Sequence, residues 1–269
     1  MSRRGALRAL ALALVALVFS LPPALLVVGS LRQPGLPPPD GFDLVPVPPR
    51  FSNYESVFAL VPLGRMLLNS VIVVVLAVPL TVLIASLAGF AIAAGRPRLR
   101  RLLIGASVLA LLVPAGALWV PRFVLFRYSG MQDSLGALVA PALMATSPFY
   151  VLLFALTYAR LPATLLDAAR VEGLGPWRTW WRIAWPLSRP TAFAVALLAF
   201  AVHWSNFIDP LLYLTSSERA TAPLGLRALA TLEPANHGIF LAGAVIVTLP
   251  AVIAFLIASR TLFARATEV

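Results

Sequence analysis

Long apolar runs, separated by short polar segments that hold most of the charge, limit what this sequence can fold into. Of its 269 residues, 60% are hydrophobic and only 12% are charged. A helix of about 20 apolar residues crosses a bilayer, whereas a soluble monomer of this composition would leave too much apolar surface in water. The sequence therefore predicts an all-α integral membrane protein, with residues 1–269 as a single transmembrane domain. Its six expected spans are residues 9–28, 66–94, 102–120, 135–159, 191–214 and 238–259.

The distribution of arginine indicates how these spans are oriented. All 21 basic residues are arginine, and 14 of them fall on one side when both termini are placed in the cytoplasm. Only three of the ten acidic residues lie on that side, so it carries the whole net charge of +11. Such an excess of basic residues is typical of cytoplasmic loops. Six spans with cytoplasmic N- and C-termini are therefore expected, and nucleic-acid binding is not needed to explain the basic composition.

Two missing residue types exclude whole classes of function. Without lysine, the chain has no Walker A lysine and cannot be a P-loop ATPase. Without cysteine, it has neither disulfides nor thiolate metal sites. His203 and Asp209 lie six residues apart with no second histidine nearby, so no metal site is predicted. With two histidines in all, no nucleophile–base pair can be assembled, and no catalytic residue is predicted.

The long polar segment 161–190 has the pattern of two short helices joined by a turn. No helix breaker occurs from Thr164 to Glu172, and Gly173 then ends the first helix. Pro176 suits the first turn of the second helix, which Pro186 is expected to end. This second helix is expected to have an aromatic face. The residues of that face are Trp177, Trp180, Trp181 and Ala184. A hairpin of this kind is typical of a docking element.

Nine residues of this segment recur at the spacing of a known signature. They are Asp167, Ala168, Ala169, Glu172, Gly173, Trp180, Ile183, Pro186 and Pro190. In this register the segment resembles the EAA loop of ABC-importer permeases, roughly E-A-A-x-x-D-G, then an aromatic residue, then I-x-x-P-x-x-x-P. Asp167 stands where the family usually has Glu, and Glu172 where it usually has Asp, so both departures keep the charge.

In that family the loop forms the coupling helices that seat in a groove of the ATPase subunit. The small side chains of Ala168 and Ala169 make physical sense for close packing there. The alternative is an amphipathic loop that lies on lipid headgroups, attracted by the five arginines of residues 160–190. The coupling residues that the resemblance implies are Asp167, Ala168, Ala169, Glu172, Gly173 and Pro186.

Polar side chains within spans are costly and are therefore candidates for function. The fifth span contains His203, Asn206 and Asp209 within seven residues. The run from Trp204 to Leu211 loosely resembles a W-N-x-x-x-x-P-L stretch that lines the translocation path or the outer gate in related permeases. In the alternative, such residues only hold helices together by hydrogen bonds. The predicted substrate-path residues are Asn69, Ser70, Trp204, Asn206 and Asp209.

Over nearly its whole length the chain resembles the smaller six-helix permease subunit of carbohydrate importers, such as the one in the maltose system. Besides the EAA-like loop, the resemblance rests on an N-Y-x-x-V-F stretch at residues 53–58, on Ala88–Ala91 and on Val120–Phe123. It implies a transmembrane permease for a sugar or an oligosaccharide, without enzymatic activity, in the inner membrane of a prokaryote.

The resemblance also implies partners. They are a second permease that forms a heterodimer with this chain, two ATP-binding subunits, an extracytoplasmic solute-binding protein and membrane lipid. No cofactor is expected on this chain, because ATP and Mg would be bound by the ATPase.

Two other transport functions remain open. An ion-coupled secondary transporter would use Asp209 or His203 as a proton relay and would need no ATPase, but the spacing of the loop residues disfavours it. An ABC permease for a non-sugar solute, such as glycerol phosphate or an amino acid, would share the same loop.

Overall fold

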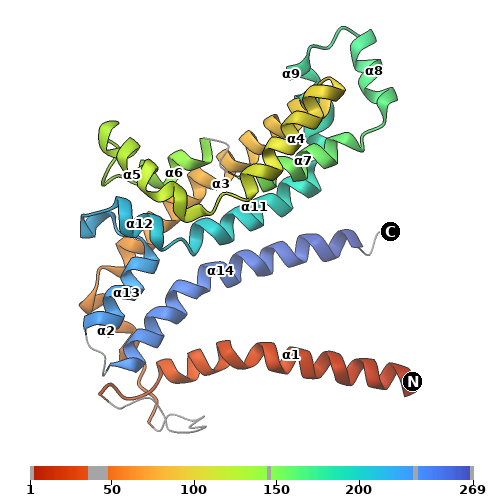
Figure 1. Cartoon of the computed structure of the whole chain (residues 1–269). Helices are drawn as coiled ribbons and strands as arrows, with labels where there is room; N and C mark the ends of the chain where they lie inside the picture. Colours follow the sequence, from red (N-terminus) through yellow and green to blue (C-terminus); the bar gives the residue numbers. More distant parts are fainter. Residues whose placement is uncertain (1–2, 36–47, 144–146, 233–235, 267–269) are drawn as a thin grey trace. The chain divides into compact units, whose positions relative to one another are not determined.

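The computed structural model describes residues 3–35, 48–143, 147–232 and 236–266, and every regular element in these residues is helical (Figure 1). The chain divides into two compact units. The first consists of Met1–Leu67 and Thr221–Val269, and the second is Leu68–Ala220.

Four helical segments are long and apolar enough to cross a membrane, and two bent helix pairs raise the number of candidates to six. The long segments are Arg8–Ser30, Leu63–Ala94, Gly136–Ala159 and His237–Arg260. The bent pairs are Pro97–Leu111 with Ala115–Tyr128, at 95°, and Pro176–Leu187 with Arg189–Trp204, at 79°. Each of these segments overlaps one expected span, and the all-α membrane fold predicted from the sequence is confirmed.

Proline explains the break in the third expected span. α4 (Pro97–Leu111) ends before Pro114, and a 3-10 turn (η1, Ala115–Leu118) leads into α5 (Trp119–Tyr128). Pro114 has no N–H to continue the helix, and its ring disfavours helical backbone at the residue before it. The segment 102–120 therefore contains parts of two helices that meet at 95°.

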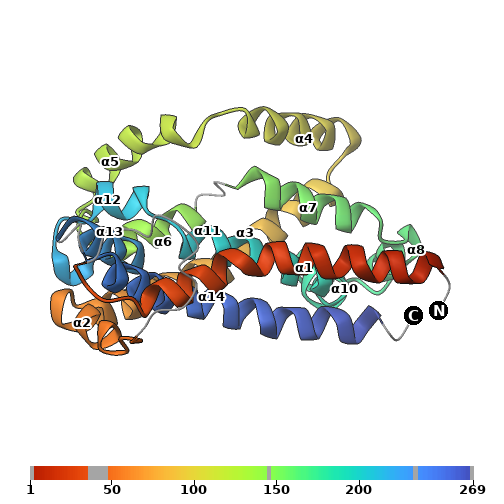
Figure 2. The same cartoon turned by 90° about the horizontal axis from the view of Figure 1, so that it is seen from below.

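In the first unit, α14 (His237–Ala266) contacts α1 (Arg3–Ser30), and Figures 1 and 2 show the two helices side by side. α2 (Ser52–Leu60) and α13 (Ala222–Leu232) also contact α14. Apolar side chains from α2, α13 and α14 form the core of this unit, with Val57 fully buried.

The side chain of Asn53 joins α2 to the end of α1. Asn53 Nδ2 donates hydrogen bonds to the backbone oxygens of Ser30 and Arg32, at 2.8 and 2.7 Å. The neighbouring Tyr54 hydroxyl lies 2.8 Å from Ser30 Oγ. The last carbonyl groups of a helix have no intrahelical partner, so these contacts complete the end of α1. The N-Y pair of the sequence motif thus has a structural role in this unit.

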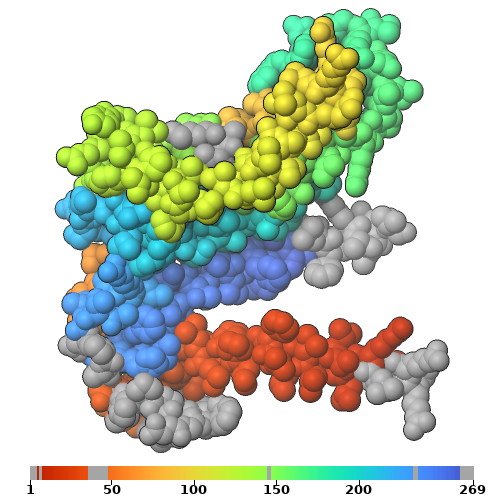
Figure 3. All heavy atoms as spheres, in the orientation of Figure 1, coloured from red at the N-terminus to blue at the C-terminus, as the bar shows by residue number. Residues whose placement is uncertain are grey.

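The second unit contains α3 (Leu63–Ala94) from residue 68 onward and two apolar cores. One core combines buried side chains of α3, α7, η2 and α11, and the other combines those of α3, α5, α6 and the α12 region. No residue of α4 is buried, and Figure 3 shows α4 (yellow) on the surface of this unit. The remaining elements are α6 (Gly136–Leu143), α7 (Pro148–Ala159), α8 (Ala163–Val171), α9 (Pro176–Thr179), η2 (Trp180–Ala184), α10 (Trp185–Leu187), α11 (Arg189–Trp204), α12 (Ile208–Tyr213) and η3 (Ser217–Arg219).

One carboxylate between α5 and α6 holds the segment that follows α12. Asp133 has a left-handed backbone (φ 54°), and its Oδ1 accepts hydrogen bonds from Thr215 N, Ser216 N and Ser216 Oγ, at 3.0, 3.0 and 2.9 Å. Its Oδ2 lies 3.2 Å from Arg219 Nη1. The hydrogen bonds from the backbone N–H groups of Ser216 and Thr215 are the main reason that the pKa of Asp133 falls from 3.8 to about 2.

Protonation of Asp133 should therefore release this segment. Because the folded pKa is lowered, the ionised carboxylate stabilises the segment fully above pH 3.8. That stabilisation declines as the pH falls and is lost below about 2. Hydrogen-exchange protection factors of the Thr215 and Ser216 amides should show this loss, while amides of α11 keep their protection. The variant Asp133→Asn should lose most of this protection at neutral pH, and equal protection in variant and native protein would contradict the assignment.

Candidate functional site

The first half of the EAA-like loop forms α8 (Ala163–Val171), which ends where the sequence predicts. Gly173 has a left-handed backbone (φ 71°). Its N–H donates to Arg170 O at 3.0 Å, and Leu174 N–H donates to Ala169 O at 2.9 Å. This is the Schellman pattern that closes a helix C-terminus. Because glycine adopts this backbone without the cost that a Cβ brings, Gly173 determines where α8 ends.

The predicted coupling residues of α8 are divided between an exposed and a buried side. Asp167, Ala168, Glu172 and Gly173 are exposed, whereas Ala169 is buried within this chain. The two alanines therefore do not form a joint exposed surface, and only Ala168 is accessible to a partner.

An apolar stripe on α8 is exposed next to these residues. Leu165, Ala168 and Val171 occupy every third position, and Val171 is 89% exposed. Asp167 is 2.9 Å from Arg170 in an exposed ion pair on the same helix. No described residue forms an ion pair with Glu172. An exposed apolar stripe beside an available carboxylate is suited to docking on a protein partner.

The second half of the loop starts with α9 (Pro176–Thr179), as predicted, but it does not end at Pro186. α9 continues through the π turn η2 (Trp180–Ala184) into α10 (Trp185–Leu187), and the chain changes direction by 79° at Ser188. The prediction that Pro186 ends this helix is therefore wrong. A π turn widens the helix, which relieves the clash between a proline ring and the carbonyl group one turn earlier.

The expected aromatic face of this helix is also divided. Trp180 and Ala184 are buried, whereas Trp177 and Trp181 are exposed. The ring centroid of Trp180 lies 5.0 Å from that of Trp177 and 5.7 Å from those of Trp181 and Trp185. The rings of Trp177 and Trp181 thus lie next to Trp180, as predicted, but only Trp180 and Ala184 meet the core of the second unit.

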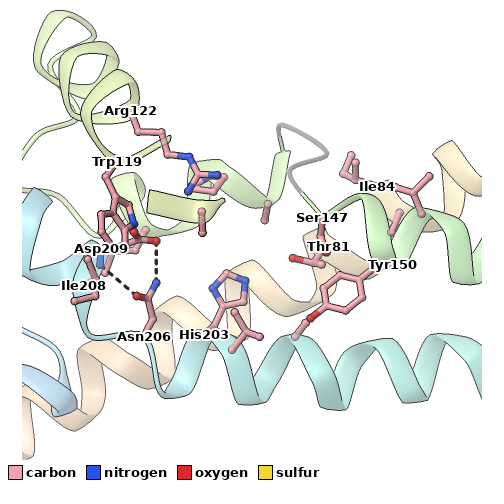
Figure 4. A pocket seen from close by; sticks show the side chains of 18 residues that line it. Thr81, Ile84, Trp119, Arg122, Ser147, Tyr150, His203, Asn206, Ile208 and Asp209 are labelled. Carbon is pink, nitrogen blue, oxygen red and sulfur yellow. Dashed lines mark hydrogen bonds between the residues drawn. The ribbon is translucent and has the colours of Figure 1, made fainter. Parts of the chain in front are cut away.

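A cavity of about 410 Å³ lies among the helices of the second unit (Figure 4). Its volume falls in the range of about 300–1,000 Å³ that small-molecule sites occupy. The side chains that line it are Thr81, Ile84, Ala85, Ala115, Trp119, Arg122, Leu138, Pro141, Ala142, Ser147, Tyr150, Val151, Ala199, Val202, His203, Asn206, Ile208 and Asp209.

Aromatic rings and hydrogen-bonding groups share the lining of this cavity. Arg122 points in from α5, and His203 and Asn206 lie on the opposite side, on α11 and just after it (Figure 4). Trp119 and Tyr150 add aromatic rings. Ring faces combined with a few convergent polar groups are suited to a small solute that carries both C–H and O–H groups.

Asn206 and Asp209 form a reciprocal pair at the wall of the cavity. Asn206 Nδ2 donates to Asp209 Oδ2 at 3.0 Å, and Asp209 N–H donates to Asn206 Oδ1 at 3.2 Å. The pair holds both side chains at the start of α12. Thr81 Oγ1, from another part of the lining, is buried and has no hydrogen-bond partner among the described residues. The wall of the cavity thus contains a pair of polar side chains held in place by hydrogen bonds, and a buried hydroxyl without a partner among the described residues.

Of the five predicted substrate-path residues, only Asn206 and Asp209 line this cavity. Asn69, Ser70 and Trp204 are buried outside its lining. The sequence reasoning missed the polar and aromatic lining that other helices contribute, because spacing along the chain does not bring these residues together. The missed residues are Thr81, Trp119, Arg122, Ser147 and Tyr150. Their polar or aromatic character within or beside apolar runs was the only available signal.

Asn69 instead joins two parts of the second unit, and Trp204 packs on a residue of its own helix. Asn69 Nδ2 donates hydrogen bonds to the backbone oxygens of Glu218 and Ala220, both at 2.9 Å. The Trp204 ring stacks on Phe200, with centroids 5.8 Å apart. The hydrogen bonds of Asn69 correspond to the alternative interpretation, in which polar residues within spans tie elements together.

The chain belongs to the family described as binding-protein-dependent transport system inner membrane component, whose family model matches residues 56–261. It is therefore a permease subunit of an ABC importer and a multi-pass protein of the bacterial inner membrane, not an enzyme. The resemblance to ABC-importer permeases is confirmed. Membership in the family implies the other components of such a system, including a binding protein and an ATPase.

Individual relatives cover most of the chain. The lactose transport system permease protein LacG of Rhizobium radiobacter is 32% identical over 78% of this chain and 76% of its own length. The arabinooligosaccharides transport system permease protein AraQ of Halalkalibacterium halodurans is 33% identical over 74% of this chain and 71% of its own.

The fold also matches a solved structure. A chain in the crystal structure of a bacterial ABC transporter involved in the import of the acidic polysaccharide alginate superposes with a TM-score of 0.78. The match covers 97% of this chain and 98% of that one, at 20% sequence identity. It supports the fold alone.

Two neighbouring glycines allow a matched test of how α8 ends. Gly173→Val should fray the last turn of α8, because a left-handed backbone costs a residue with a Cβ about 1 kcal/mol or more. Gly173→Asn should keep most of the protection, since asparagine tolerates this backbone. Gly175→Ala is the control, because Gly175 has φ −69° and no atom within 4 Å of an added Cβ. Hydrogen exchange of the Gly173 and Leu174 amide positions measures the effect, and equal exchange in the Gly173→Val and Gly175→Ala variants would refute it.

Proposed function

We propose that this chain is the transmembrane permease subunit of a binding-protein-dependent importer for a sugar or an oligosaccharide. The observation that carries the solute class is the cavity, in which the rings of Trp119 and Tyr150 accompany Arg122, Asn206 and Asp209. Sugars have C–H faces that pack on aromatic rings and hydroxyl groups that need hydrogen-bond partners. The names of the two relatives, which refer to lactose and to arabinooligosaccharides, support the same class.

We propose that α8 is the contact with an ATP-binding subunit in the cytoplasm. The exposed stripe of Leu165, Ala168 and Val171 would enter an apolar groove, and the Glu172 carboxylate would meet a cationic group at its edge. ATP and Mg are bound by that partner. The chain itself has no lysine for a phosphate-binding loop.

The proposed assembly contains one further permease, two ATP-binding subunits and an extracytoplasmic solute-binding protein. Residues 1–269 act in it as a single transmembrane permease domain with six spans. The large apolar side chains exposed along α1 and α4 are suited to contact with lipid or with the second permease. Of the 21 arginines, 14 face the cytoplasm in this arrangement, and no nucleic acid is involved.

The proposed mechanism is alternating access. ATP binding closes the two ATP-binding subunits and moves the docked α8. Helices that line the cavity, including α3, α7 and α11, shift with it and change the side to which the cavity opens. The residues of the cavity bind the solute by aromatic contact and hydrogen bonds, and no covalent step takes place on this chain.

Substitutions at the cavity wall should reduce uptake without disturbing assembly. Asp209→Asn removes a charged acceptor at nearly constant size, and Asn206→Ala removes the amide. The loss of a hydrogen bond to a charged group corresponds to a decrease in uptake of about tenfold or more. Ser205→Ala is the control, because Ser205 is exposed and its Oγ donates to Ala201 O within its own helix turn, at 2.7 Å.

The measurement is uptake of radiolabelled lactose and of an arabinooligosaccharide into proteoliposomes that contain the complete transporter. Unchanged uptake of both solutes by both cavity variants would show that Asn206 and Asp209 only stabilise the start of α12.

Charge reversal at the end of α8 should weaken docking. Glu172→Arg places like charges opposite each other if the groove is cationic, and such a juxtaposition costs several kcal/mol, or about a hundredfold or more in affinity. Glu55→Arg is the control, because Glu55 is an equally exposed acid on α2, far from the loop in sequence. Co-elution of the ATPase with each purified variant is the measurement. Full co-elution with the Glu172→Arg variant would refute a docking role for this carboxylate.

A further inference from the structure

A continuous chain of hydrogen bonds is buried where the coupling loop meets the membrane helices. Trp180 Nε1 donates to Ser86 Oγ at 3.0 Å, Ser86 Oγ lies 2.6 Å from the Tyr158 hydroxyl, and that hydroxyl lies 3.0 Å from Ser188 Oγ. None of these four side chains is more than 2% exposed. We refer to Trp180, Ser86, Tyr158 and Ser188 as the buried relay.

The direction of donation in the buried relay follows from its two ends. An indole N–H can only donate, so Ser86 Oγ accepts from Trp180 and has its own hydrogen left for Tyr158. At the other end, Ser188 Oγ donates to Trp185 O at 3.0 Å, so it accepts from Tyr158. Each hydroxyl therefore accepts once and donates once. A chain of this kind is cooperative, and the removal of one member leaves its neighbours unsatisfied.

Each member of the relay comes from a different part of the second unit. Trp180 begins the π turn of the coupling loop, and Ser188 is at the bend where the loop enters α11. Ser86 lies on α3 and Tyr158 on α7. The relay thus joins the second half of the coupling loop to three long helices.

Close packing of α3 and α7 surrounds the relay. A Cβ on Gly89 would lie 2.5 Å from Phe154 Cβ and 2.8 Å from Ala155 N, so the two helix backbones are almost in contact. The ring of Tyr158 meets that of Phe90 edge to face, with centroids 5.6 Å apart. A core packed this closely moves as a block and transmits displacement.

The same three helices carry part of the cavity lining. On α3, the lining residues Thr81 and Ile84 come within five residues of Ser86. On α7, the lining residue Tyr150 is two turns before Tyr158. On α11, His203 is the last residue that lines the cavity. The relay therefore joins the coupling loop to the same helices that carry part of the cavity lining.

We propose that the buried relay is the positioning element that makes the coupling loop move together with α3, α7 and α11. This inference rests on the proposed coupling of α8 to an ATPase. An apolar core of the same shape would hold the helices together nearly as well, because the replacement of paired polar groups by apolar ones can be almost neutral for stability. What the directed hydrogen bonds add is one specific alignment of the π turn with the helices, and that alignment carries the motion of the ATPase to the cavity.

The test measures coupling and not only activity. The complete transporter, with its ATPase and binding protein, is reconstituted in proteoliposomes, and ATP hydrolysed per solute imported is determined with radiolabelled lactose or an arabinooligosaccharide. Tyr158→Phe and Ser86→Ala each interrupt the relay with little change of shape. Each should co-elute with the ATPase and hydrolyse ATP, but should consume about threefold or more ATP per imported solute, as expected for the loss of a buried hydrogen bond.

Tyr54→Phe is the matched control. It also removes a tyrosine–serine hydrogen bond, at 2.8 Å to Ser30 Oγ, but it lies in the first unit. Its ratio of ATP to solute should equal that of the native protein. The double variant Ser86→Ala/Tyr158→Phe should be no worse than the poorer single variant, because both changes interrupt the same chain.

Two outcomes would overturn the inference. One is a native ratio in both Tyr158→Phe and Ser86→Ala. The other is a ratio that rises equally in Tyr54→Phe, since that effect would reflect general loss of stability. Failure of the native chain to co-elute with its ATPase would overturn the proposed function itself, and is thus distinguishable from failure of the relay.

Discussion

Polar groups within apolar helices need partners, because lipid provides none. In both units of this protein, side chains distant in sequence supply those partners. Asn53 donates to the backbone oxygens at the end of α1, and Asn69 donates to those of Glu218 and Ala220. Trp180 begins a chain of four donors that ends on the backbone of its own loop. These contacts determine how the helix ends are placed, and the functional parts of the molecule are at helix ends.

The breaks between helices have different causes and different consequences. Pro114 interrupts the third expected span, because proline has no N–H to continue the helix. After this break, the chain places Trp119 and Arg122 in the wall of the cavity. The end of α11 at Trp204 allows Asn206 to pair with Asp209 at the cavity. A continuous helix at either place would present different side chains. Interrupted helices at membrane depth are tolerated where they line a cavity, and this arrangement agrees with that rule.

Much of the coupling loop was predictable because its pattern is local. A helix that ends with a left-handed residue needs only a run of good helix formers followed by glycine. Gly173 follows α8 in this way, so the end of this helix can be read from a few adjacent residues. The features that could not be predicted depend on distant contacts. Whether Pro186 ends its helix depends on the π turn before it, and the burial of Trp180 depends on Ser86, 94 positions earlier in the sequence. Neither feature has a signature in the loop itself.

The sequence by itself determined the all-α membrane fold, the end of α8 at Gly173 and the family, and it predicted six spans and their orientation. These properties follow from hydropathy, arginine distribution and glycine backbone freedom, which act over one helix or one turn. Only the tertiary structure decided that Asn206 and Asp209 line the cavity while Asn69 does not, and that Ala169 is buried while Ala168 is exposed. The physical reason is that a cavity and a buried relay are each made by side chains from several helices, whose relative placement depends on close packing between residues far apart in the chain.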